Sequence, residues 1–166
     1  MPYADRFIPT DELILHLSGI TPGITDPGLL ANYAGFLSVS AVTVYELAIK
    51  DIFEAFAKKK HKTFGYFIQG HFERINGRIK LDNLKNDHIQ GFGNGYVKKF
   101  KNELAARESS VFALVHLSVK NCYNNLIICR HQFVHGGSPT LSFGEVVTNY
   151  NHGKHVIHSL DKAMRR

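Results

Sequence analysis

One stretch of the chain, residues 29–62, constrains the fold more than any other part. Its sequence is LLANYAGFLSVSAVTVYELAIKDIFEAFAKKKHK, and its apolar residues recur with a helical period at positions 41, 45, 48, 49, 52, 53 and 56. The internal piece VSAVTVY is rich in β-branched residues and would suit a strand by itself. No turn signal interrupts the helical period before Phe56, so we predict one long helix. Lys58, Lys59 and Lys60 then fall in its last turn, where the helix dipole favours cations.

The other segments of the first 108 residues are shorter and are separated by turn signals. Their predicted boundaries are a helix over Asp11–Ser18, a loop over Thr21–Gly28, a helix over 63–75, a turn at Asn76–Gly77, a helix from a cap at Asp82 to about Gln90, and, after the break at GFGNG, a helix over 96–108 capped by Asn94. On the last helix the apolar positions 96, 97, 100 and 104 form one buried stripe.

The C-terminal half centres on a long apolar pattern that starts after Ser110. Positions 111, 112, 115, 119, 122, 126 and 129 fall on one face, which predicts a central helix over 111–130. The sequence HGGSPT ends this helix, because glycines suit a left-handed turn and Pro139 prevents continuation. Ser142 and Glu145 match a capping box for a last helix that runs to about Met164. We therefore predict an all-α fold, a single-domain helical bundle over residues 30–166 with an N-terminal short helix and loop, residues 1–29, packed on it.

Composition narrows the class of protein. The 166 residues are 44% hydrophobic and 20% charged, an ordinary globular balance. No apolar run approaches the ~20 residues of a membrane span, and the polar start of the chain is unlike a signal peptide, so we expect a cytoplasmic protein without membrane contact. Cys122 and Cys129 would lie ~10.5 Å apart on one helix, too far for a disulfide, so we expect reduced and mostly buried thiols. The net charge of +6 makes nucleic acid a partner to consider.

Several short motifs can be explained either by a purely structural role or by a chemical one. GFGNG lacks the spacing and the preceding strand of a dinucleotide fingerprint, so it is expected to be a helix–helix turn. His152, His155 and His158 are spaced to share a metal on adjacent turns, and Cys129, His131 and His135 are conceivable ligands of a mixed site. Neither set has the paired ligands of a zinc signature, so no metal and no other cofactor is expected.

A basic cluster, Lys98, Lys99 and Lys101, surrounds Phe100 on the predicted helix over 96–108. A solvated helix face that holds one buried phenylalanine explains this pattern. The alternative is a ridge that contacts RNA phosphates, which would supply affinity without sequence choice.

The sequence CRHQFVHGG, residues 129–137, places Arg130, His131 and His135 at the end of the central helix. A guanidinium binds phosphate bidentately, and an imidazole moves protons near neutrality. A helix that continues through these residues would turn Arg130 and His135 ~140° apart. The helix must therefore end or bend between them, or the two side chains must meet across a symmetric dimer.

This arrangement resembles the HEPN superfamily, whose signature is R-x4-6-H with Asn, Asp or His after the arginine. Here the signature is Arg130-His131-Gln132-Phe133-Val134-His135-Gly136. The resemblance includes Tyr45-Glu46 in the long early helix, HIQGFGNGYVKKFKNEL before the motif helix and the Ser-capped helix behind it. It covers roughly residues 30 to 164, and the layout is similar to that of the RiboL-PSP-type or related MAE-type domains.

The resemblance implies a metal-independent endoribonuclease that acts as a homodimer, with both motifs at the interface. It implies that Arg130 stabilises the phosphate and that His135 is the principal acid–base group. It also implies that His131 helps to orient or polarise the reacting groups. It further implies a toxin or phage-defence effector, with an antitoxin as a partner besides the RNA substrate. The alternatives are a catalytically silent HEPN-type module that binds RNA or protein, and a nucleotide-binding or nucleotidyl-transfer role.

Overall fold

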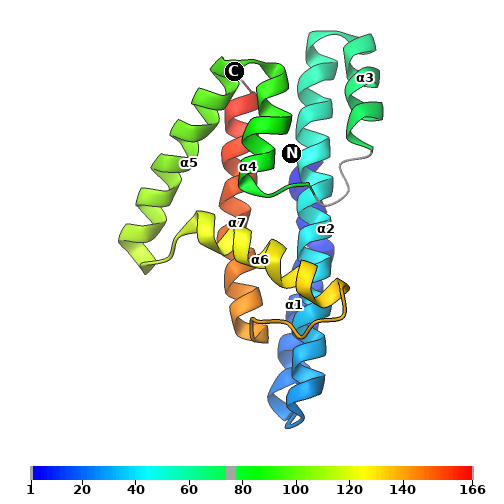
Figure 1. Ribbon diagram of the computed structural model, residues 1–166, viewed down its shortest axis with the longest axis vertical. Helices are drawn as coiled ribbons and strands as arrows, with labels where there is room; N and C mark the ends of the chain where they lie inside the picture. The colour runs from blue at the N-terminus through cyan, green and yellow to red at the C-terminus, as the bar shows by residue number, and fades with distance from the viewer. Residues whose placement is uncertain (1, 74–77, 166) are drawn as a thin grey trace.

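A computed structural model describes residues 2–73 and 78–165, and within these ranges every regular element is a helix and none is a strand (Figure 1). The prediction of an all-α fold is confirmed. The predicted turn at Asn76–Gly77 lies outside the described residues. The elements are η1 (Pro2–Phe7), α1 (Ile8–Ile20), η2 (Thr21–Gly23), α2 (Pro27–Lys60), α3 (Lys62–Phe72), α4 (Leu81–Asn83), the π-helical turn η3 (Leu84–His88), η4 (Ile89–Phe92), α5 (Asn94–Val115), α6 (Val119–Val134) and α7 (Phe143–Met164).

The long helix α2 is continuous, as predicted, and packs against α3, α6 and α7. Asp26 caps it, since its Oδ1 accepts a hydrogen bond from the N–H of Gly28 at 2.8 Å, and Pro27 occupies the first turn. Its last turn carries Lys58, Lys59 and Lys60. Figure 1 shows α7 running alongside α2, α3 folding back from the end of α2, and α6 crossing both long helices. Because α6 crosses α2, its C-terminal end comes to lie on the first half of α2.

Three buried tyrosines fix this crossing. The ring of Tyr45 on α2 stacks between Tyr123 on α6, at 5.4 Å, and Tyr150 on α7, at 5.7 Å. The Tyr45 hydroxyl donates to the carbonyl of Tyr150 at 2.5 Å, and the Tyr123 hydroxyl donates to the carbonyl of Ile79 at 2.7 Å. A Cβ on Gly153 of α7 would lie 2.6 Å from the Tyr45 hydroxyl oxygen, so only glycine permits this approach. Each buried hydrogen bond contributes about 1 kcal/mol, and together they define how α6 lies on α2 and α7.

The N-terminal segment contributes to the same core. Tyr3 and Phe7 are buried, and the ring of Phe7 makes edge contacts with Tyr45 and Tyr150. Arg6 forms a bidentate ion pair with Asp51 of α2. The first helix is longer than predicted: α1 spans Ile8–Ile20, because η1 leads directly into it.

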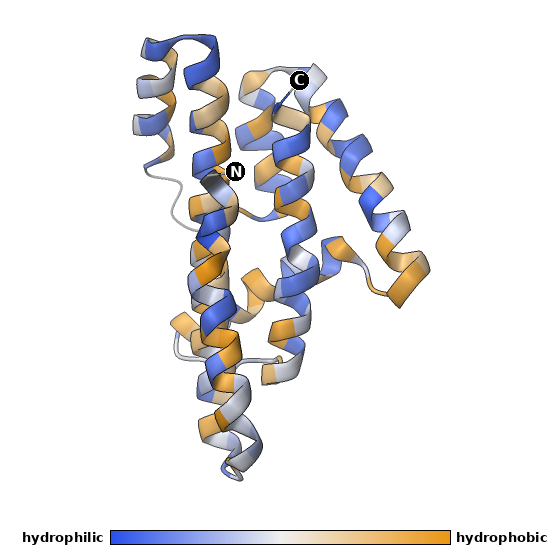
Figure 2. Ribbon diagram, turned by 180° about the vertical axis from the view of Figure 1, so that it is seen from behind, coloured by the Kyte–Doolittle hydropathy of each residue, from blue (hydrophilic) through white to orange (hydrophobic). Residues whose placement is uncertain are grey.

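The boundary between α5 and α6 differs from the prediction. The break was expected before Val111, but α5 continues to Val115 and the chain turns at His116, whose φ is 56°. The apolar period runs on across the turn, so it does not mark the break. As a result Phe112 and Val115, predicted on the buried face, are 53% and 47% exposed, and Figure 2 shows a hydrophobic last turn of α5 at this elbow.

Polar groups set the start of α6 instead. The Ser118 Oγ accepts from the N–H of Asn121 and donates to Glu108 Oε1 at 2.5 Å. The other carboxylate oxygen of Glu108 accepts from the N–H of Lys120 at 3.1 Å. Ser118 and Glu108 thus satisfy two of the free N–H groups at the start of α6, which is why the helix begins there.

Two predicted caps are wrong and one is confirmed. Asp82 lies inside the first turn, where it pairs with Lys85, and the residue at the cap, Lys80, makes no side-chain capping bond. Asn94 is already helical, because Gly93 takes the cap position with a φ of 108° that suits glycine. The capping box at the start of α7 is present: Ser142 accepts from the N–H of Glu145, and that carboxylate accepts from the N–H of Ser142. Helix α7 ends at Met164, as predicted.

Candidate functional site

The C-terminal end of α6 is held on α2 by Phe133. Its ring lies 5.2 Å from the ring of Phe36, edge to face. A Cβ on Gly35 would come within 2.2 Å of the Phe133 ring, so the missing side chain at Gly35 makes room for this ring. Cys129, one turn earlier, is fully buried. The position of the motif residues therefore depends on the close approach of two helices at a single glycine.

The helix stops directly after the motif. Helix α6 ends at Val134, and His135 takes the cap position with φ −92° and ψ 20° while its N–H still donates to the carbonyl of His131 at 3.2 Å. Gly136 adopts a φ of 81°, the left-handed conformation that was predicted for this glycine pair. The N–H of Gly137 donates back to the carbonyl of Gln132 at 2.9 Å. These bonds fix the backbone on which His135 is displayed.

The structure brings His131 and His135 together. Their ring centroids lie 4.3 Å apart with the rings tilted by 55°, and both side chains are exposed. Arg130 is half-buried, and at 100° per residue it lies ~140° around the helix from His135. No hydrogen bond or ion pair holds its guanidinium to residues in the described ranges. One chain thus presents an imidazole pair, with the guanidinium on another face of α6.

The predicted basic cluster lies elsewhere in the bundle. Lys98, Lys99 and Lys101 are exposed on the first turns of α5. Lys99 and Lys101 differ by ~160° around the helix, and Lys99 lies over the ring of Tyr96 at 5.1 Å. Figure 1 shows the start of α5 beside the C-terminal end of the chain, far from the end of α6. A single chain does not gather these lysines around the motif.

The histidines of α7 are partly withdrawn from solvent. His158 Nδ1 lies 3.0 Å from the hydroxyl of Tyr3, and neither the Nδ1 of His152 nor that of His155 has a hydrogen-bond partner among the described residues. Burial, reinforced by the charge of Arg107, lowers the pKa of His155 to about 4 and also lowers the pKa of His158. Within residues 2–73 and 78–165 no three His, Cys, Asp or Glu side chains are arranged to hold a metal ion.

Both cysteines are free and buried, in agreement with the prediction for their thiols. Burial raises the pKa of Cys122 and of Cys129, which keeps them protonated and poor nucleophiles. Cys129 therefore serves packing, although it adjoins Arg130 in the sequence.

A small cleft beside α6 was not predicted. It has a volume of about 140 Å³ and is lined by Lys80, Leu81, Asp82, Asn124 and Ile128. Asn124 Oδ1 accepts a hydrogen bond from the N–H of Leu81 at 3.4 Å, and Ile128 lies one turn before His131. Lys80 thus brings a cation to the face of α6 that carries the histidine pair. No sequence pattern links Lys80 to the motif, because the contact is made only by the packing of α4 on α6.

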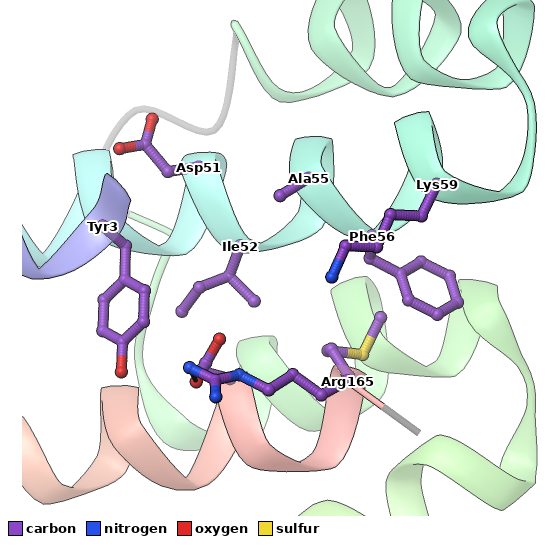
Figure 3. Close-up of a pocket in the computed structure, with 9 residues that line it drawn as sticks. Tyr3, Asp51, Ile52, Ala55, Phe56, Lys59 and Arg165 are labelled. Atoms are coloured by element: carbon purple, nitrogen blue, oxygen red, sulfur yellow. Dashed lines mark ion pairs between the residues drawn. The ribbon is translucent and has the colours of Figure 1, made fainter. Parts of the chain in front are cut away.

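A larger pocket, of about 390 Å³, lies between η1, α2 and the end of α7 (Figure 3). Both of its carboxylates are already paired, Asp51 with Arg6 and Asp161 with Arg165. Burial, followed by the charge of Asp161, raises the pKa of Tyr3 to about 12, so its hydroxyl stays protonated. None of its lining residues belongs to the motif, so this pocket is separate from the candidate site.

Comparison with known proteins identifies the class. The family model described as RiboL-PSP-HEPN matches residues 5–166, nearly the whole chain. The chain therefore belongs to the RiboL-PSP-HEPN family, and the resemblance predicted from the motif and helix order is confirmed. The match also includes most of the N-terminal segment. Searches of curated proteins and of solved structures gave no match. None of the helices in the described residues is long and apolar enough to span a membrane.

Proposed function

We propose that this protein is a metal-independent endoribonuclease whose chemistry is carried by Arg130, His131 and His135. The observation that carries the proposal is the exposed imidazole pair, 4.3 Å between ring centroids, at the end of the motif helix of a HEPN-family chain. The chain keeps the arginine, the polar residue after it and the histidine of the family signature. The family assignment and the geometry support RNA as the substrate.

RNA supplies its own nucleophile, the 2′-hydroxyl. Attack of O2′ on the adjacent phosphorus forms one P–O bond, and the P–O5′ bond breaks as the 5′-oxygen leaves. A base must accept the 2′-hydroxyl proton, and an acid must protonate the leaving oxygen. His135 serves one of these roles, and the second imidazole is the His135 of a partner subunit. Arg130 stabilises the negative charge on the phosphorane through a bidentate contact, and His131 orients the reacting groups.

A homodimer completes this site, because Arg130 and His135 point to different faces of one α6. Exposed apolar side chains surround the motif: Phe36 on α2, and Ile128 and Val134 on α6. Ile128, His131 and His135 follow the three- and four-residue spacing of one helical face. Burial of this face against a second copy would remove its apolar surface from water and bring two imidazole pairs together.

We further propose that cleavage acts as a toxin or a phage-defence response, with an antitoxin protein as the controlling partner. The family resemblance supports this role. Induced expression of the wild-type chain should arrest growth, while equal expression of the His135→Ala chain should not. Growth arrest by both chains would overturn the role, since it would show toxicity without cleavage.

The activity is tested with purified wild type, His135→Ala and Arg130→Ala, whose folding is first compared by circular dichroism. Each is incubated with a mixed RNA pool in the presence of EDTA. Wild type should cleave, and each variant should lose about 10²- to 10⁴-fold of the rate, the usual contribution of an acid–base or charge-stabilising group. Undiminished cleavage by both variants would refute the site. Binding without cleavage by wild type would favour the catalytically silent RNA-binding module.

A further inference from the structure

Aromatic rings and lysines meet at the end of the bundle that is farthest from the motif. Four rings from four elements form what we call the aromatic seam: Phe56 on α2, Phe64 on α3, Phe92 on η4 and Tyr96 on α5. The centroid of Phe56 lies 5.4 Å from that of Phe92 and 5.1 Å from that of Tyr96, and Phe64 lies 6.1 Å from Phe92. The seam therefore joins the end of α2 to the starts of α3 and α5.

Two lysines lie over the seam. The Nζ of Lys60 is 5.4 Å from the centroid of Phe56, and the Nζ of Lys99 is 5.1 Å from that of Tyr96. The neighbouring Lys58 is paired with Glu54, whereas Lys59 and Lys60 have no ion-pair partner in the described part of the chain. Positive charge is thus concentrated where the rings are, and it comes from helices that are remote in sequence.

A cleft of about 180 Å³ continues the seam between α3 and η4. It shares Phe64 and Phe92 with the seam and is further lined by Phe67, Ile68, His71, Phe72, Asp87, His88 and Gly91. Phe67 is 67% exposed, and its ring is nearly parallel to that of His71. The cleft is smaller than the ~300–1,000 Å³ of sites for larger organic ligands, and its ring-lined walls suit one planar heterocycle.

We propose that the aromatic seam and its cleft bind single-stranded RNA, with a base stacked against Phe67 in the cleft and phosphates held by Lys60 and Lys99. Rings that alternate with lysines are the means by which proteins hold single strands without reading sequence. Asp87 supplies a carboxylate for the edge of the base, and its Oδ2 also accepts a hydrogen bond from Asn83 at 2.8 Å. A membrane would require a continuous apolar face, and an acidic peptide would leave the ring-lined cleft without a fitting group.

In the proposed nuclease, the aromatic seam would give the RNA substrate a second binding surface besides the motif. From Gly35, where α6 lies on α2, to Lys60 is 25 residues of helix, or ~37 Å. At ~3.4 Å per stacked nucleotide, a strand of about 11 nucleotides spans that length. Short RNAs should therefore engage one surface only, and longer RNAs should engage both.

Binding is measured by fluorescence anisotropy with a labelled 20-nucleotide RNA in which every 2′-hydroxyl is methylated, so that cleavage cannot interfere. Lys60→Gln/Lys99→Gln is compared with Arg107→Gln/Lys120→Gln, which removes the same charge from exposed sites outside the seam. The first pair should weaken binding at least fivefold more than the second and reduce the slope of log Kd against log salt by about 1.4.

The ring contribution is tested with Phe67→Ala against Phe112→Ala, another exposed phenylalanine. Phe67→Ala should weaken binding by roughly 5- to 100-fold at unchanged salt slope, and Phe112→Ala should not. Equal effects of the paired variants, or seam-dependent binding to phosphatidylserine vesicles in place of RNA, would overturn the proposal. The anisotropy result stands without cleavage, so a failure of the proposed nuclease activity is distinguished from a failure of the seam.

Discussion

The ring centroids of His131, in the last turn of α6, and of His135, the residue that caps the helix, lie 4.3 Å apart, immediately before the glycine turn. The pair is exposed, and it is presented by a helix end that Phe133 anchors on Gly35. In the proposed dimer, a two-fold partner would bring a second pair of imidazoles to them. The roles of the two histidines should differ, and substitution separates them.

Substitution of each histidine by asparagine distinguishes a role in orienting the reacting groups from a role in proton transfer. If His131 orients, His131→Asn keeps a hydrogen-bonding group and should retain cleavage within about tenfold of wild type, whereas His131→Ala should lose more. His135→Asn should be as inactive as His135→Ala, about 10²- to 10⁴-fold below wild type, because an amide does not transfer protons. Initial cleavage rates on one RNA decide this. Equal losses for Asn and Ala at position 131 would contradict the orienting role.

The dimer is tested by placing a charge on the motif face. Ile128→Asp should convert a dimer into a monomer and abolish cleavage while leaving the helical content unchanged, because the carboxylate would be buried in the proposed interface. Leu114→Asp is the matched control, since Leu114 is 81% exposed at the end of α5, away from the motif. Light scattering after size exclusion measures the mass. A dimeric Ile128→Asp chain would show that the interface lies elsewhere.

The anchoring of α6 predicts opposite effects at two glycines. Gly35→Ala should destabilise the fold by about 1–3 kcal/mol and reduce cleavage, because its Cβ would lie 2.2 Å from the Phe133 ring and displace it. Gly70→Ala on α3 meets nothing within 4 Å and should stabilise by about 0.5–1 kcal/mol through helix propensity. Urea unfolding gives both values. A neutral or stabilising Gly35→Ala would refute the close approach.

Acid should weaken the fold through the histidines of α7. His155 has its pKa lowered to about 4 in the folded protein, so the unfolded chain binds a proton that the folded chain excludes between about pH 6.5 and pH 4. The free energy of unfolding should therefore fall as pH decreases through that range. The positive charges of Arg107, His152 and His158 also lower the pKa of His155.

Substitution isolates this effect from the carboxylates that also titrate in acid. His155→Gln removes the titrating group, so its unfolding free energy should change less between pH 7 and pH 4.5 than that of wild type. Parallel pH dependences for the two proteins would assign the acid sensitivity to other groups.

Sequence patterns predicted those elements whose determinants are local. The period of α2, the Ser142–Glu145 capping box and the glycine turn after His135 all depend on residues within a few positions of each other. The break between α5 and α6 was misplaced because Glu108 reaches across the turn to the start of α6, an interaction that no hydrophobic period encodes.

The candidate site shows the same division. The end of the helix at the motif and the free, buried cysteines were predictable from local sequence. The contact of Phe133 with Gly35, the cleft at Lys80 and the aromatic seam join segments that are far apart in the sequence. These features follow from the packing of α4, α5 and α6 on α2, which a single sequence does not reveal.

The most direct test of the account is the chemistry of the RNA ends. Wild type is incubated in EDTA with an RNA that it cleaves, and with the same RNA carrying a single 2′-deoxy nucleotide before the scissile bond. Attack by the 2′-hydroxyl predicts a 2′,3′-cyclic phosphate and a 5′-hydroxyl, no cleavage of the deoxy substrate, and cleavage by His135→Ala that is about 10²- to 10⁴-fold slower. Products with a 5′-phosphate, or cleavage of the deoxy substrate at the same bond, would contradict the proposed roles of Arg130 and His135.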